Sequence, residues 1–137
     1  MRILVVDDNK TNRIIMNEMA GKFGSVDLAE DGNDAIEKAK NAILKKQYYD
    51  LIFMDIAMPE RDGKDAVRII RWLEEVKGYS QQEVAKIVMT TAFDDKGNIL
   101  ESFKNQCEDY LVKPITLHAL KETLEKLNLL DPKSNDE

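Results

Sequence analysis

Short apolar runs alternate with segments of helical periodicity along most of the chain. Strands are predicted at residues 3–6, 25–29, 51–55, 85–91 and 110–112. Between these runs, apolar residues recur every three or four positions, which is typical of amphipathic helices. Regular alternation of strand and helix predicts an α/β fold, with a parallel sheet, helices on both faces and right-handed crossovers.

The helical segments also predict which side chains face the core. Five stripes are expected to point inward: Ile15, Met19 and Phe23; Ile36, Ala39 and Ile43; Ala66, Ile70 and Leu73; Ile99, Leu100 and Phe103; and Leu117, Leu120, Leu124 and Leu127. The second helix is expected to reach about Gln47. Trp72 lies off the stripe of its helix, and we expect it to cover a neighbouring segment. Residues 80–83, Ser-Gln-Gln-Glu, fit a capping box and predict a short helical turn.

Composition limits the class of protein. The 137 residues suit one domain, expected at residues 1–130, followed by a disordered polar tail at 131–137. A net charge of −6 disfavours direct binding to nucleic acid. No apolar run approaches the roughly 20 residues that span a bilayer, so no membrane insertion is expected. A single cysteine rules out an internal disulfide, and a cytoplasmic location is expected.

Polar groups follow four of the predicted strands: Asp7 with Asp8, then Asp55, Thr91 and Lys113. Because the carboxyl ends of parallel strands share one edge, we expect these groups to lie together. Two carboxylates about 5 Å apart repel by roughly 3 kcal/mol at an effective dielectric constant of 20. A basic side chain or a divalent cation relieves this repulsion, and all-oxygen ligands favour Mg²⁺, or Mn²⁺, over zinc. Such a site suits phosphoryl transfer to an aspartate nucleophile.

These residues and their neighbours resemble the receiver domain of two-component response regulators, over Arg2 to about Leu127. The resemblance rests on four motifs in chain order: Val5-Val6-Asp7-Asp8-Asn9 with Asn12-Arg13; Phe53-Met54-Asp55-Ile56-Ala57-Met58-Pro59 with Asp62-Gly63; Met89-Thr90-Thr91-Ala92; and Asp109-Tyr110-Leu111-Val112-Lys113-Pro114. It implies a flavodoxin-like (βα)5 fold with strand order 2-1-3-4-5.

The resemblance also implies roles around the metal and the phosphoryl group. Asp55 is expected to accept a phosphoryl group from a phosphohistidine. Asp8 is expected to bind Mg²⁺ directly and Asp7 largely through water, with Asp55 and the backbone carbonyl of Ala57 as further ligands. Lys113 is expected to pair with a phosphoryl oxygen and to precede a cis peptide bond.

Further roles concern signal output. Thr91 is expected to hydrogen-bond the phosphoryl group, and Tyr110 to turn inward as Thr91 moves, although Tyr110 also fits an ordinary strand position. The switching surface would comprise the fourth helix, fifth strand and fifth helix. The implied partners are a sensor histidine kinase or histidine phosphotransfer protein and a downstream target protein. The resemblance leaves open both a monomer and a phosphorylation-dependent dimer, and implies a stand-alone phosphoacceptor rather than an enzyme.

Two positions are expected to set the lifetime of the phosphorylated state. Ala57 lies two residues after Asp55, and Phe93 two residues after Thr91. In the family that the chain resembles, these positions influence how water reaches the acyl phosphate. Neither side chain can orient a water molecule by hydrogen bonding, so self-dephosphorylation is expected to be slow.

Two alternative functions fit the sequence less well. A metal-dependent phosphatase with an aspartyl nucleophile needs a second acid two residues after the nucleophile, where this chain has Ala57. A pseudo-receiver that acts only as an interaction module usually lacks the acid pair, the acceptor or the lysine, and all are present here. His118 is expected at the surface, and Cys107 is expected to be a small buried group.

Overall fold

Five parallel strands form one sheet in the computed structural model, which describes residues 1–56, 58, 63–92 and 106–130. The order is β2-β1-β3-β4-β5, as predicted. The strands are β1 (Arg2–Val6), β2 (Ser25–Ala29), β3 (Leu51–Asp55), β4 (Lys86–Thr91) and β5 (Asp109–Val112).

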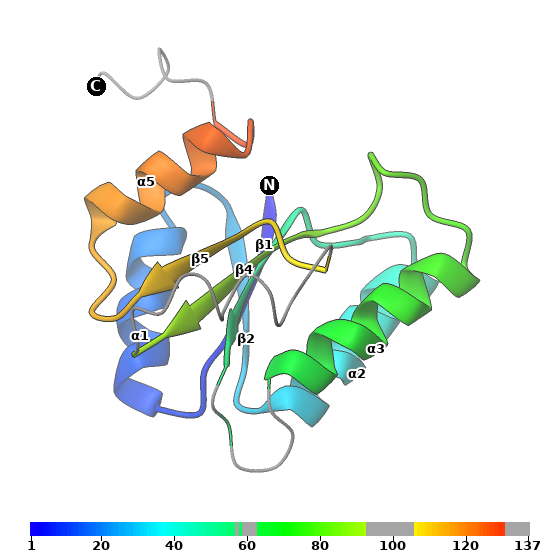
Figure 1. Cartoon of the computed structure of the whole chain (residues 1–137), viewed down its shortest axis with the longest axis horizontal. Helices are drawn as coiled ribbons and strands as arrows, with labels where there is room; N and C mark the ends of the chain where they lie inside the picture. The colour runs from blue at the N-terminus through cyan, green and yellow to red at the C-terminus, as the bar shows by residue number, and fades with distance from the viewer. Residues whose placement is uncertain (57, 59–62, 93–105, 131–137) are drawn as a thin grey trace.

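Helices cover both faces of this sheet. They are α1 (Lys10–Ala20), α2 (Gly32–Leu44), α3 (Gly63–Val76) and α5 (Leu117–Lys126). Figure 1 shows α1 and α5 on one face and the α2–α3 pair on the other. The predicted helix with Ile99, Leu100 and Phe103 lies outside the described residues. No helix within the described ranges is both long and apolar enough to cross a membrane.

The sheet separates two hydrophobic clusters because successive strand side chains point to opposite faces. In β3, Ile52 and Met54 join the cluster beneath α2 and α3, whereas Leu51 and Phe53 join the cluster beneath α1 and α5. Burial on both faces explains why β3 reads as an uninterrupted apolar run. Asp55 is the last residue of this strand and is only 4% exposed.

Two of the predicted helical stripes are partly wrong. In α1 the buried residues are Met16 and Ala20, and Ile15 is 47% exposed. In α5 the buried residues include Leu120 and Leu124, whereas Leu117 is 39% exposed. The apolar arc on each helix is wider than the part that contacts the sheet, so periodicity alone does not identify the buried face.

Two further local predictions need correction, and a third is confirmed. Helix α2 ends at Leu44 rather than near Gln47, because Lys46 has a φ of 56° and the N–H of Gln47 donates to the carbonyl of Ala42 at 2.9 Å. Trp72 covers no neighbouring segment among the described residues and is 59% exposed.

The capping box and its short helical turn are present. The Glu83 carboxylate accepts from the Ser80 N–H at 2.9 Å, and the Val84 N–H donates to the Ser80 carbonyl at 3.1 Å.

Arg71 joins α3 to the beginnings of β4 and β5. Its guanidinium donates to both carboxylate oxygens of Glu108 (2.9 and 3.1 Å), to Glu74 (2.8 Å) and to the carbonyls of Ala85 (2.8 Å) and Gln106 (2.9 Å). All the N–H donors of an arginine are thereby used. Glu74 in turn accepts from the Ala85 N–H at 2.8 Å and is 3% exposed. This network closes the edge of the sheet where the strands begin.

We expect Arg71→Met to lower the free energy of unfolding by about 3–5 kcal/mol, because the buried carboxylate of Glu74 and the partly buried carboxylate of Glu108 would lose their cation. Arg68→Met is the matched control, since Arg68 is exposed and lies 3.7 Å from Asp65. That control is expected to cost no more than about 1 kcal/mol. Urea denaturation measures both, and equal losses would show that the Arg71 network contributes no more than a surface ion pair.

Candidate functional site

Three carboxylates meet at the carboxyl edge of the sheet. Asp7 and Asp8 directly follow β1, and Asp55 ends the neighbouring β3, where Val6 is in register with Met54. Carboxylate oxygens of all three lie within 4.8 Å of one another. Asp7 is 2% exposed and Asp55 4%, whereas Asp8 is exposed. The predicted cluster therefore exists, with two buried members and one that faces solvent.

Lys113 supplies the positive charge of the cluster. Its Nζ lies 3.0 Å from Asp7 Oδ2 and 3.3 Å from Asp55 Oδ1. Its backbone N–H donates to the carbonyl of Thr91 at 2.7 Å, which holds the end of β5 beside β4. The bond to Pro114 is cis, as expected. One ammonium group thus bridges the two buried carboxylates.

The turn after β1 fixes the position of Asp7. Its Oδ1 accepts from the Asn9 N–H at 2.9 Å, and its carbonyl accepts from Arg13 Nη1 at 2.7 Å. Asn9 also caps α1, because its side chain accepts from the N–H of Asn12 at 2.9 Å. The same few residues therefore begin the helix and hold the carboxylate in place.

The electrostatics of the cluster favour an added cation. Burial and the nearby charge of Asp7 raise the pKa of Asp55 to about 6, even though Lys113 acts in the opposite direction. Burial alone would lower the pKa of Lys113, but its contacts with Asp7 and Asp55 outweigh burial and raise it. Within the part of the chain that the structure describes, one lysine faces three carboxylates, and the resulting net negative charge suits a divalent ion with oxygen ligands.

The remaining predicted residues differ in what the structure describes. Thr91 ends β4 and is 5% exposed, and Tyr110 in β5 packs partly buried against the cluster beneath α2 and α3. β4 lies beside β3, the strand that carries Asp55, and β5 lies beside β4. Thr90, the preceding residue of β4, is 3% exposed. Ala57 and Phe93 lie outside the described residues.

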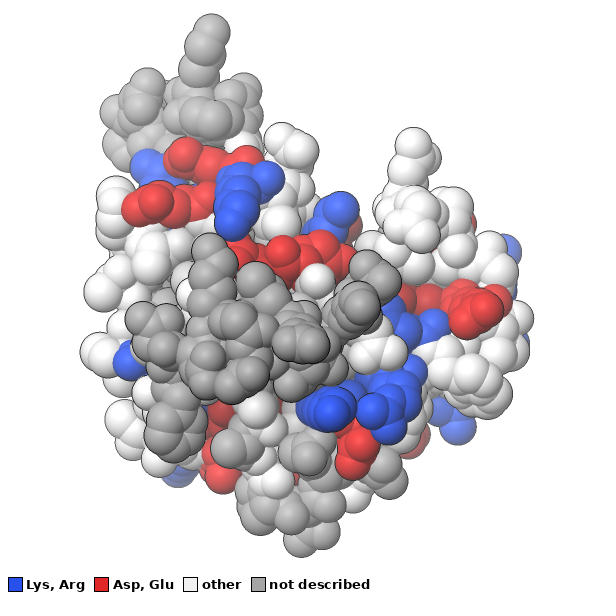
Figure 2. All heavy atoms as spheres, viewed as in Figure 1, with Lys and Arg blue, Asp and Glu red and all other residues white. Residues whose placement is uncertain are grey.

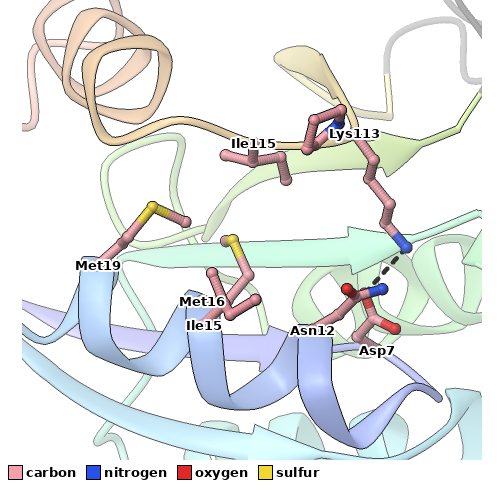
Figure 3. A pocket seen from close by; sticks show the side chains of 8 residues that line it. Asp7, Asn12, Ile15, Met16, Met19, Lys113 and Ile115 are labelled. Atoms are coloured by element: carbon pink, nitrogen blue, oxygen red, sulfur yellow. Dashed lines mark ion pairs between the residues drawn. The ribbon is translucent and has the colours of Figure 1, made fainter.

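An apolar groove beside the cluster was not predicted from the sequence. It has a volume of about 80 Å³ between α1 and the segment after β5, and it is lined by Asp7, Asn12, Ile15, Met16, Met19, Lys113, Pro114 and Ile115. Figure 3 shows the Asp7–Lys113 ion pair at one end of it and the two methionines at the other. The available signal was the excess of apolar residues on α1, which the sequence reasoning placed in the core.

Two other reactive residues lie apart from the cluster. His118 is exposed on α5 and pairs with Glu122. Cys107 is half-buried, and burial raises the pKa of its thiol to about 11. The thiol is therefore protonated at neutral pH, which fits the prediction of a small packed group.

Comparison with known proteins assigns the family. Residues 3–125 match the response regulator receiver domain. The chain belongs to this family. The osmosensing histidine protein kinase SLN1 of Saccharomyces cerevisiae is 36% identical over 126 residues, which cover 90% of this chain but only 10% of that kinase. The receiver therefore spans a small part of this curated relative.

Two solved structures resemble this receiver closely. The receiver domain of the histidine kinase CKI1 from Arabidopsis thaliana, complexed with Mg²⁺, has a TM-score of 0.79 at 26% identity, covering 92% of this chain and 90% of that one. The receiver domain of the Saccharomyces cerevisiae response regulator Ssk1, crystallised with the histidine phosphotransfer protein Ypd1, has a TM-score of 0.75 at 34% identity, covering 92% and 87%.

The raised pKa of Asp55 predicts a stability difference that depends on pH. The folded-state value of about 6 lies above the value of 3.8 for an ordinary aspartate, so ionisation destabilises the metal-free fold as the pH rises between these values. Asp55→Asn is therefore expected to be more stable than the wild type above pH 6, by up to about 3 kcal/mol.

Well below pH 3.8 the difference should disappear, because Asp55 is then protonated in both folded and unfolded chains. Urea denaturation in a metal-free buffer at about pH 3 and at about pH 7.5 measures it. Added Mg²⁺ should stabilise the wild type more than the variant. A variant that is less stable than the wild type at pH 7.5 would contradict this account of Asp55.

Proposed function

We propose that Asp55 accepts a phosphoryl group from a phosphohistidine on a partner protein and that the acyl phosphate switches a protein-binding surface. The observation that carries this proposal is the cluster itself. Carboxylate oxygens of Asp7, Asp8 and Asp55 lie within 4.8 Å of one another, and Lys113 contacts two of the three residues. A structural ion pair needs neither the third carboxylate nor its exposure to solvent.

The transfer follows from the chemistry of these groups. A carboxylate oxygen of Asp55 forms a bond to phosphorus as the phosphorus–nitrogen bond to the donor imidazole breaks, and the electron pair of that bond stays with the imidazole nitrogen. Lys113 neutralises charge on the phosphoryl oxygens, and the Thr91 hydroxyl donates a hydrogen bond to one of them. The pKa of about 6 leaves Asp55 mostly ionised, and hence nucleophilic, at pH 7.

Mg²⁺ is the cofactor that this donor set fits. When bound, the ion neutralises charge on the phosphoryl oxygens during transfer. Asp8 is the exposed member of the cluster and would bind it directly, with Asp55, and Asp7 largely through water, as in the family expectation. The Mg²⁺ complex of the CKI1 receiver supports this assignment. Mn²⁺ has the same preference for oxygen ligands.

The partner that donates the phosphoryl group would dock over the apolar groove. The groove runs directly from the Asp7–Lys113 pair, and Ile15, which lines it on α1, is 47% exposed. A donor histidine must approach Asp55 from this edge of the sheet. The complex of the Ssk1 receiver with Ypd1 supports a histidine phosphotransfer protein, or the corresponding part of a sensor kinase, as the partner.

The output would pass through β5. Thr91 and Tyr110 are on neighbouring strands, and Met89 is in register with Tyr110. A shift of Thr91 toward a phosphoryl group would open room near Tyr110, and α5 follows directly after this strand. We propose that a downstream target reads this surface, or that two phosphorylated copies pair through it.

The direct test is intact mass after incubation with acetyl phosphate and Mg²⁺. The wild type is expected to gain one phosphoryl group of about 80 Da and Asp55→Asn none. No gain in the wild type, with metal binding demonstrated separately, would favour a pseudo-receiver. A gain that persists in Asp55→Asn would place the acceptor on another residue.

The groove generates a prediction about partner specificity. Ile15→Glu is expected to slow transfer from a phosphorylated histidine phosphotransfer protein by roughly tenfold or more, since a contact worth about 1.5 kcal/mol or more is lost. Transfer from acetyl phosphate should be unchanged, because that small donor needs no docking surface. Ile14→Glu is the matched control, because Ile14 is a 51% exposed isoleucine on the same helix that does not line the groove. Equal slowing by both variants would contradict docking at the groove.

The lifetime of the acyl phosphate remains a prediction from the sequence. Because Ala57 follows Asp55 by two residues and Phe93 follows Thr91 by two, phosphorylated protein is expected to persist for minutes or longer without a phosphatase. Ala57→Gln, which adds a side chain able to orient water, should shorten that lifetime. Mass spectrometry of purified phosphorylated protein over time measures both. Loss within seconds in the wild type would show that these side chains do not protect the site.

A further inference from the structure

Three large apolar side chains are exposed at the carboxyl ends of α2 and α3. Leu44 is 53% exposed, and Trp72 and Val76 are each 59% exposed. Trp72 and Val76 are four residues apart on α3, so they lie on the same helix face. Because α2 and α3 return from the acidic edge, these ends lie at the opposite edge of the sheet (Figure 1).

The two helix ends are joined by hydrogen bonding and ring packing. The hydroxyl of Tyr79 donates to the carbonyl of Ile43 at 2.7 Å, one residue before Leu44. The rings of Tyr48 and Tyr79 pack edge to face with centroids 5.3 Å apart. The surface that carries the exposed apolar side chains is therefore preformed.

The two helices together carry charge of the opposite sign to the whole chain. Residues 32–47 and 63–78 contain eight Lys and Arg and five Asp and Glu, although the chain carries a net charge of −6. In Figure 2 the larger basic patch lies over the amino-terminal part of this helix pair, and both basic and acidic side chains lie toward its carboxyl ends. Lys45, Lys46 and Lys77 are exposed beside the apolar group and form no ion pair with any residue in the described ranges.

We propose that the carboxyl ends of α2 and α3 form a docking surface for an acidic amphipathic helix of a partner protein. Leu44, Trp72 and Val76 would contact the apolar face of that helix. Its Glu and Asp side chains would meet Lys45, Lys46 and Lys77. A central tryptophan with flanking charges is the composition typical of an energetic centre in protein interfaces.

The distribution of acidic residues favours a helix over an anionic membrane as the occupant. Glu37 and Glu75 are exposed on the same two helices, and Glu75 adjoins Val76. A uniformly anionic surface would face these carboxylates, whereas a peptide places its charges only opposite the lysines. The apolar side chains are also confined to one end of the helix pair, which suits a discrete partner.

Docking at this surface is independent of the acceptor. The acidic cluster lies at the carboxyl ends of β1 and β3, and the proposed surface lies at the far ends of the helices that return from that edge. Binding should therefore be the same for the wild type and Asp55→Asn. Failure of phosphorylation at Asp55 and failure of docking would thus be separate results.

Trp72 is the only tryptophan of the chain and reports on this surface directly. The test is titration of the full chain with a synthetic, tryptophan-free amphipathic helix that carries Leu on one face and Glu beside it. A saturable blue shift of Trp72 emission is expected. Amide NMR shifts should map to residues 40–47 and 72–79.

Matched variants and peptides decide the outcome. Lys45→Glu with Lys77→Glu should weaken binding by about tenfold, and Lys22→Glu, an exposed charge reversal after α1, should leave it unchanged. A peptide with Lys in place of Glu should not bind. Equal binding of both peptides, NMR shifts elsewhere, or a blue shift with phosphatidylglycerol vesicles but not with the acidic peptide would overturn the proposal.

Discussion

Mutual repulsion among buried carboxylates is the constraint on which this structure depends. Parallel pairing of β1 with β3 forces Asp7 and Asp55 to the same edge, and burial reduces the water that would screen them. Lys113, which follows the edge strand β5, forms ion pairs with both of these carboxylates. The position of β5 and the turn that follows it are therefore tied to the charge at the centre of the sheet.

Charged side chains are paired differently at the two edges of the sheet. At the amino edge, Arg71 uses all its donors on two carboxylates and two carbonyls, so that network is complete within the protein. At the carboxyl edge one ammonium group faces three carboxylates among the described residues, so the charges of those residues do not balance. A network whose charges and hydrogen bonds are all satisfied stabilises the fold. A network with unbalanced negative charge instead favours binding of a cation and, together with that cation, of a phosphoryl group. The distinction explains why chemistry is expected at one edge only.

The sequence predicted the fold and the acidic cluster because both follow from short-range rules. Alternation of strands and helices requires parallel topology, and a parallel sheet places Asp7, Asp55 and Lys113 at one edge whatever the loop details. Helix phase was harder: Ile15 and Leu117 fit an apolar stripe but lie at its rim, because packing against the sheet selects only part of a wide apolar arc.

Other features could not be predicted because they depend on distant residues. Arg71 pairs with Glu108, which is 37 residues away in the sequence, and the periodicity of apolar residues does not predict such a pair. Trp72 was expected to cover a neighbouring segment because it lies off the apolar stripe of its helix, yet it is 59% exposed. The groove beside α1 needs the segment after β5 as its second wall. Each of these features depends on how helices and strands are placed relative to one another, which the local sequence pattern does not give.

The most direct measurement of the central claim is a ¹³C NMR titration of the Asp55 carboxyl carbon, with and without Mg²⁺. Without metal, the account predicts titration near pH 6, from burial and the adjacent charge of Asp7. With saturating Mg²⁺, the midpoint should move well below its metal-free value because the ion stabilises the carboxylate. Titration at an ordinary aspartate value that is unchanged by Mg²⁺ would contradict a cluster held together by unbalanced negative charge.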